Sequence, residues 1–109
     1  MREIDEIIVH CSATPKGRAI STEIIKRWHL EKGSADIGYH YVIELDGSIE
    51  EGRDVLDKGA HCYGRNSKTI GVCYVGGCDE NMNPLDTRTK AQKESLLFLL
   101  NYLKNLYPI

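Results

Sequence analysis

The sequence predicts an α/β domain of the α+β type, in which a mixed central β-sheet is flanked by helices. The 109 residues suffice for one modest core, and no repeat, low-complexity tract or linker divides the chain. Runs rich in β-branched and aromatic residues at about 4–10, 39–45 and 70–75 are typical of strands. The segments that follow Ser21 and Thr89 carry apolar residues at helical spacing.

The first half of the chain is expected to form a strand, a helix and a hairpin. The strand covers about residues 4–10, and Ser21 is a suitable N-cap for a helix that ends near Lys32, before Gly33. The buried face of this helix is predicted to carry Ile24, Ile25 and Trp28. Asp46-Gly47 between two strand-like runs is a strong hairpin signal.

The second half is expected to supply the central strand and a long helix. Residues 52–68 look like loop, whereas 70–75 are apolar on both faces and therefore belong in the middle of the sheet. After a loop over 76–86, Thr89 and Gln92 form a capping box. The helix that follows ends before Pro108 and carries Leu96, Leu97, Leu99, Leu100, Leu103 and Leu106.

Charge and composition exclude some classes of function. A formal net charge of −2 argues against binding nucleic acid through its phosphates. No apolar run has the length of a membrane span, and the N-terminus lacks a signal-peptide core, so we expect synthesis in the cytoplasm and no membrane partner. The four cysteines lack a CxxC pair and are expected to be reduced and mostly buried, with a Cys62–Cys78 disulfide as the alternative.

Histidines and one tyrosine are the candidates for chemistry. His10 ends a buried strand, which holds an imidazole rigidly enough to bind a metal ion, although a structural role is an equal alternative. His61 lies in a glycine-rich loop, free to meet a substrate or simply solvated. Strand alternation predicts that Tyr39 and Tyr41 share a face and that His40 points to the core.

Three further expectations concern the surroundings of these residues. The phenol of Tyr39 is placed to hydrogen-bond a metal-bound water or an oxyanion, with simple packing as the alternative. His29 is expected to be exposed. Arg53 and Asp54 are expected to form a surface pair that contributes little to stability.

Several short segments follow one another along the chain in a characteristic order. They are Ile8-Val9-His10-Cys11-Ser12-Ala13-Thr14, Trp28-His29, Gly38-Tyr39-His40-Tyr41, Asp46-Gly47, Gly52-Arg53, Ala60-His61, Asn66, Ile70-Gly71-Val72-Cys73-Tyr74-Val75-Gly76-Gly77 and Thr89-Lys90-Ala91-Gln92. As a set, over nearly the whole chain, they resemble the zinc-dependent N-acetylmuramoyl-L-alanine amidases. The resemblance is closest to the bacteriophage lysozymes of amidase type, in a family that includes the peptidoglycan recognition proteins.

This resemblance implies hydrolysis of the amide between N-acetylmuramic acid and L-alanine in peptidoglycan, at the bacterial cell wall. A zinc ion would lower the pKa of its bound water and polarise the carbonyl. By position, His10 matches the first zinc ligand and Tyr39 the catalytic tyrosine. His61 matches a histidine beside the substrate, and Trp28 and Asn66 lie in matching segments and are expected to contact substrate too.

The resemblance also implies ligands that this sequence lacks. In the family, a second histidine ligand, a cysteine ligand and a catalytic lysine follow the long C-terminal helix, whereas this sequence stops at Ile109. We therefore expect residues 1–109 to be an amidase-like domain without its C-terminal strand and loop, and the other ligands to lie beyond residue 109. Cys11, Cys62 or His61 could recruit a metal instead. The alternative function is a metal-free, non-catalytic peptidoglycan-binding module.

Overall fold

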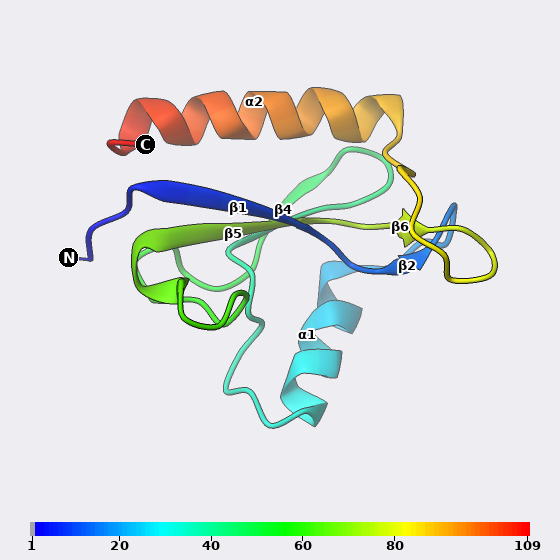
Figure 1. Cartoon of the computed structure of the whole chain (residues 1–109), viewed down its shortest axis with the longest axis horizontal. Coiled ribbons are helices and arrows are strands. Elements are labelled where there is room, and N and C mark those ends of the chain that lie inside the picture. The colour runs from blue at the N-terminus through cyan, green and yellow to red at the C-terminus, as the bar shows by residue number, and fades with distance from the viewer. Residues whose placement is uncertain (1) are drawn as a thin grey trace.

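The computed structural model describes residues 2–109, which form a four-stranded mixed sheet with one helix on each face (Figure 1). The strands lie in the order β1, β5, β3, β4, and β5 is parallel to both of its neighbours. Their bounds are β1 Glu6–Cys11, β3 Tyr41–Ile43, β4 Ile49–Glu51 and β5 Thr69–Tyr74. The helices are α1, Thr22–Glu31, and α2, Lys90–Leu106. A short pair, β2 Thr14–Pro15 and β6 Gly77–Cys78, and a 3₁₀ turn, Asn66–Lys68, complete the described elements.

The sheet separates two apolar cores, because β5 is buried on both faces, as its composition predicts. Between the sheet and α2 lies a core that contains Ile70 and Val72 of β5 and Leu103 of α2, all fully buried. Between the sheet and α1 lies a smaller core that includes Val42 and Ile25. Tyr39 packs against this smaller core, and His10 and His61 lie beside it on the α1 side of the sheet.

Local chemistry sets the helix ends where the sequence predicts them. The Ser21 hydroxyl accepts a hydrogen bond from the Ile24 amide at 3.2 Å and starts α1, and Gly33 follows its end with φ +96°, a conformation that favours glycine. At α2, Thr89 and Gln92 form the predicted capping box.

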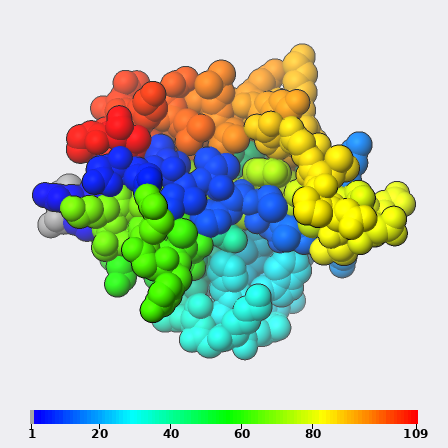
Figure 2. Space-filling view, viewed as in Figure 1, coloured from blue at the N-terminus to red at the C-terminus, as the bar shows by residue number. Residues whose placement is uncertain are grey.

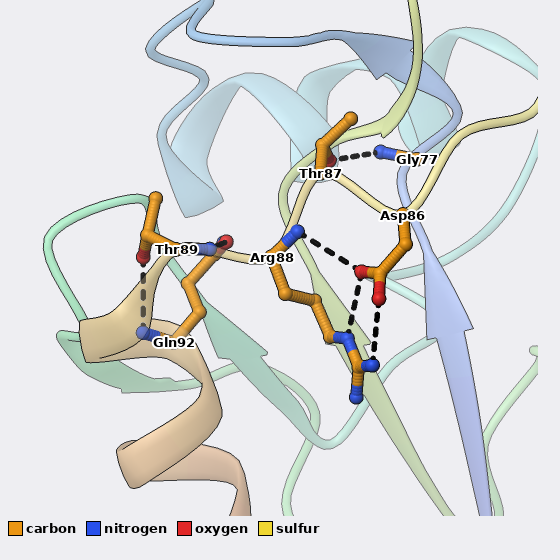
Figure 3. Close-up of polar contacts among 6 residues, drawn as sticks. All are labelled: Gly77, Asp86, Thr87, Arg88, Thr89 and Gln92. Atoms are coloured by element: carbon orange, nitrogen blue, oxygen red, sulfur yellow. Dashed lines mark hydrogen bonds and ion pairs between the residues drawn. The ribbon is translucent and has the colours of Figure 1, made fainter.

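The segment before α2 is held by a hydrogen bond to β6 and by an ion pair within the segment itself (Figure 3). The Thr87 hydroxyl accepts a hydrogen bond from the Gly77 amide at 2.8 Å, and Arg88 pairs with Asp86 at 2.8 Å. The Gln92 side chain is 1% exposed and donates to the carbonyl oxygens of Val75, at 2.9 Å, and Ile43, at 3.3 Å. Gln92 therefore both caps α2 and ties it to the ends of two strands.

Strand β1 is an edge strand of the described sheet. It pairs only with β5, and it runs across one face of the molecule between α2 and the loop that precedes β5 (Figure 2). Val9 in this strand is 42% exposed. No helix among residues 2–109 is long and apolar enough to cross a membrane.

Three expectations for individual residues differ from the structure. The first strand begins at Glu6 rather than near residue 4. Tyr39 and Tyr41 do not share a face: Tyr39 packs on the α1 side and Tyr41 on the α2 side, because regular pairing begins only at Tyr41. Trp28 is 36% exposed and does not join the buried face of α1.

Two more outcomes concern polar residues and cysteines. Arg53 does not pair with Asp54. Its guanidinium instead donates to the carbonyl oxygens of Ile37 and Lys58, both at 2.9 Å, and so braces the loop that leads into β3. All four cysteines are unpaired in the structure, with Cys73 and Cys78 buried and Cys11 and Cys62 partly exposed, so the reduced state stays a prediction.

Candidate active site

Strand β1 delivers His10 near its carboxyl end, where the chain is about to leave the sheet. His10 pairs in register with Cys73 of β5, so the two side chains project from the same face. The His10 ring is half-buried, with its centroid 5.3 Å from that of Tyr39. Burial lowers the pKa of His10, which keeps the imidazole neutral at pH 7.

Tyr39 is positioned by the residue before it and by α1. The Gly38 amide donates to Nδ1 of His29 at 2.8 Å, and the His29 ring lies 5.3 Å from that of Tyr39. Gly38 is pressed against the loop opposite: a Cβ there would lie 2.2 Å from the Ala60 carbonyl oxygen. Only glycine fits this approach, and the contact holds Tyr39 beside His10.

The phenol of Tyr39 is a hydrogen-bond donor over the whole neutral range. Burial raises the pKa of Tyr39 far above its usual value, and the neighbouring Cys73 thiol acts in the same direction. Burial likewise raises the pKa of Cys73 to about 12. Both groups therefore stay protonated at neutral pH, and Cys73 has the character of a packed, unreactive thiol.

His61 comes from the loop that precedes β5 and reaches His10 across the surface of the sheet. Its Nδ1 lies 2.9 Å from Nε2 of His10, and its Nε2 lies 3.1 Å from the Thr69 hydroxyl. Asn66 holds the backbone of this loop, since its side-chain oxygen accepts from the amides of His61 and Cys62, both at 3.0 Å. The loop is thus built to present the ring of His61.

The surroundings of His61 disfavour its charged form. Burial is the largest cause, followed by the neighbouring imidazoles of His10 and His40, and together they lower the pKa of His61 to about 4. At pH 7 the ring is therefore neutral and carries a single proton. The site is a set of uncharged donors and acceptors rather than a cluster of cations.

His40 is a structural neighbour of the site. It is 1% exposed, as the sequence predicts for a core-facing residue. Its Nδ1 accepts from the Gly71 amide at 3.0 Å, so the ring proton sits on Nε2 and is donated to the Asp57 carbonyl oxygen at 2.8 Å. The Arg2 guanidinium, 3.2 Å from the same Nε2, meets another donor and forms no hydrogen bond there.

The predicted site residues fall into two groups. The structure brings His10, Tyr39 and His61 together, although 51 residues separate the two histidines in the chain. Asn66 supports this group from behind, through the loop backbone. Trp28, on α1, is 36% exposed.

Sequence reasoning missed His29. It was expected to be exposed, but it is half-buried and accepts the Gly38 hydrogen bond that supports Tyr39. Its partner lies nine residues further along the chain, outside any helical or strand spacing. No local pattern could therefore have indicated the contact.

A family model described as N-acetylmuramoyl-L-alanine amidase matches residues 1–109, the whole of this sequence. The chain belongs to this amidase family. It is 44% identical over 106 residues to an endolysin of Klebsiella phage KP32, and 45% identical over 96 residues to the endolysin of Escherichia phage T7. These matches cover 97% and 88% of this chain, and 70% and 64% of the two endolysins.

A solved structure gives the same result for the fold of this amidase domain. The N-acetylmuramoyl-L-alanine amidase LysC from Clostridium intestinale superposes with a TM-score of 0.86 at 30% identity. The match covers 99% of this chain and 67% of that protein. The predicted α+β class and the resemblance to the amidases are therefore both confirmed.

Amidases of this family are generally zinc-dependent. A catalytic zinc takes about three protein ligands and keeps one position open. Within residues 2–109 no three His, Cys, Asp or Glu side chains are grouped so that they could hold one metal ion. His10 and His61 lie side by side, but their facing nitrogens are 2.9 Å apart and hydrogen-bonded to one another. The described residues alone do not fit the ion.

Proposed function

We propose that this chain is the substrate-facing part of a peptidoglycan amidase, which hydrolyses the amide between N-acetylmuramic acid and L-alanine. The observation that carries the proposal is the grouping of His10, Tyr39 and His61 in a chain that the amidase family matches from end to end. Its endolysin relatives support the bacterial cell wall as the place of action.

We further propose roles for individual residues. Tyr39 donates a hydrogen bond to the carbonyl oxygen of the scissile amide, where negative charge develops during hydrolysis. Its raised pKa suits this role, because the phenol remains protonated at neutral pH. Asn66 is proposed to act indirectly, by holding the loop that carries His61, and Trp28 is proposed to contact the glycopeptide outside the group of His10, Tyr39 and His61.

Zinc is proposed as the cofactor, with His10 as one of its ligands. Because residues 2–109 supply no complete ligand set, the proposal requires that the other ligands come from groups outside these residues. Zinc would supply an activated water and polarise the amide carbonyl.

The same ligand count favours a second candidate function. A chain that presents the site residues and lacks a full ligand set among residues 2–109 could bind peptidoglycan without cleaving it. The two functions differ in a single measurable respect, since only hydrolysis needs the metal.

The deciding experiment measures binding of purified muropeptide and release of its peptide, with added zinc and with a chelator. Amidase function predicts release that the chelator abolishes and that His10→Ala abolishes as well. Glu3→Gln is the control, because Glu3 is an exposed residue outside the site and its substitution is expected to leave release unchanged. Binding without release under every condition would instead establish the non-catalytic module.

A further inference from the structure

Thr69, the first residue of β5, sets the direction of a chain of hydrogen bonds. Its side chain is 2% exposed, and its hydroxyl lies 2.8 Å from the Arg65 carbonyl oxygen and 3.1 Å from Nε2 of His61. A carbonyl oxygen can only accept, so the single hydroxyl proton of Thr69 goes to Arg65. The Thr69 oxygen must then accept from His61, which places the proton of the neutral His61 ring on Nε2.

The tautomer of His61 determines which atom donates in its hydrogen bond to His10. With its proton on Nε2, His61 presents a lone pair on Nδ1, and this atom lies 2.9 Å from Nε2 of His10. Two facing lone pairs would repel one another at this distance, so Nε2 of His10 must carry the proton that His61 accepts. In the neutral His10 ring, the one remaining lone pair is then on Nδ1.

Two glycines leave the space in which the His61 ring is held. A Cβ on Gly71 would lie 2.5 Å from Cγ and Cδ2 of that ring, and a Cβ on Gly59 would lie 2.9 Å from its Cδ2. The ring is therefore pressed flat against the backbone of β5 and of the loop. A ring seated in this way cannot turn over without moving its neighbours, so the hydrogen-bond direction is not averaged by rotation.

We propose that His61 is a positioning residue. Its hydrogen bond to Thr69 fixes its own tautomer, its hydrogen bond to His10 then fixes the tautomer of His10, and Nδ1 is left as the His10 atom open to a ligand. This differs from the substrate contact that the resemblance implies for His61. The proposal rests on the proposed function only in treating His10 as a residue of the reacting centre. The tautomers themselves are properties of the ligand-free chain.

The test is to determine the tautomers of His10 and His61 by ¹⁵N-edited NMR of the whole chain at neutral pH, with a chelator present. Protonated and unprotonated ring nitrogens are well separated in ¹⁵N chemical shift. We expect both rings to carry their proton on Nε2. A proton on Nδ1 of His10 would overturn the proposal, and this result needs no variant.

A matched pair of variants tests the role of Thr69. Thr69→Ser keeps the hydroxyl and is expected to leave both tautomers unchanged. Thr69→Val keeps the shape and removes the acceptor, so that a proton on Nε2 of His61 would be buried without a partner. We expect the pair to reverse, with His61 donating from Nδ1 and His10 protonated on Nδ1. Wild-type tautomers at both rings of a folded Thr69→Val chain would contradict this positioning role.

These spectra are recorded without substrate, so their outcome is separate from that of the hydrolysis assay. The expected tautomers in a chain that releases no peptide would leave the positioning role of His61 standing and count against the amidase proposal alone. Peptide release by a chain with the opposite tautomers would do the reverse.

Discussion

Removing the Tyr39 hydroxyl distinguishes a role of this residue in hydrolysis from a role in packing alone. Tyr39→Phe keeps the ring beside His10 and deletes only the donor. If the hydroxyl acts in the transition state, we expect turnover of muropeptide to fall by about 10²-fold. The midpoint of urea unfolding should change little, because the ring supplies most of the packing.

Tyr41→Phe is the matched control for this substitution. Tyr41 lies two residues away, packs on the α2 side of the sheet and is remote from His10. The Tyr41→Phe substitution should leave turnover of muropeptide unchanged. Equal turnover in both variants would show that Tyr39 only packs.

Protonation of His40 is expected to make the free energy of unfolding depend on pH. Burial lowers the pKa of His40 below the ordinary value of 6.5. Below about pH 6.5 the unfolded chain therefore takes up a proton that the folded chain does not, so the free energy of unfolding should fall as the pH is lowered from about 8 to about 5.5. His40→Gln removes this titration, so unfolding of the variant should depend less steeply on pH.

Urea unfolding of both proteins at several pH values measures this slope. The pKa values of His10, His29 and His61 are also lowered, so the slope should be reduced rather than abolished. An unchanged slope in His40→Gln would mean that His40 is protonated alike in the folded and unfolded states.

At the scale of elements, Gln92 joins the start of α2 to the sheet. Gln92→Glu keeps the oxygen that accepts from the Thr89 amide, so the capping box is retained, but it removes the donor to Val75 and Ile43. Two buried carbonyl oxygens then face a carboxylate. We expect a loss of at least about 2 kcal/mol in the free energy of unfolding at pH 7.

The control for this variant is Lys93→Gln, one residue further along the same helix and exposed to solvent. It should shift the free energy of unfolding by less than about 0.5 kcal/mol. Similar losses in the two variants would indicate that Gln92 acts only through helix propensity.

The elements that the sequence predicts well are those set by neighbours in the chain. Ser21 caps α1, Thr89 and Gln92 cap α2, and Asp46-Gly47 turns the hairpin, all through contacts within a few residues. The short pair β2 and β6 was missed because each strand has two residues, too few to show a period. The opposite faces of Tyr39 and Tyr41 were missed because alternation holds only within a paired strand.

The candidate site also has features that the sequence predicts and features that it does not. His10 is visible in the sequence because it ends an apolar run, and the order of motifs points to Tyr39 and His61. The contact between His10 and His61, the support of Tyr39 by His29 and the seat that Gly71 leaves for His61 all join segments distant in sequence. No spacing rule encodes such contacts, so they emerge only from the folded chain.

At the scale of the whole molecule, the larger apolar core and the candidate site lie on opposite faces of the sheet. The larger core lies under α2, whereas the candidate site and the smaller core lie on the α1 side. A cavity on either side lowers the stability of one cooperative domain. Only a cavity on the α1 side also loosens the helix whose His29 supports the segment that carries Tyr39.

Leu103→Ala and Ile25→Ala form the pair that tests this division, since the first residue is fully buried and the second is 2% exposed. Each should lower the free energy of unfolding by about 2–5 kcal/mol. At a temperature where both variants remain folded, Leu103→Ala should bind and turn over muropeptide like the wild type, and Ile25→Ala should do so less well. Equal impairment in the two variants would mean that packing under α2 also shapes the site, and that the sheet transmits strain from one face to the other.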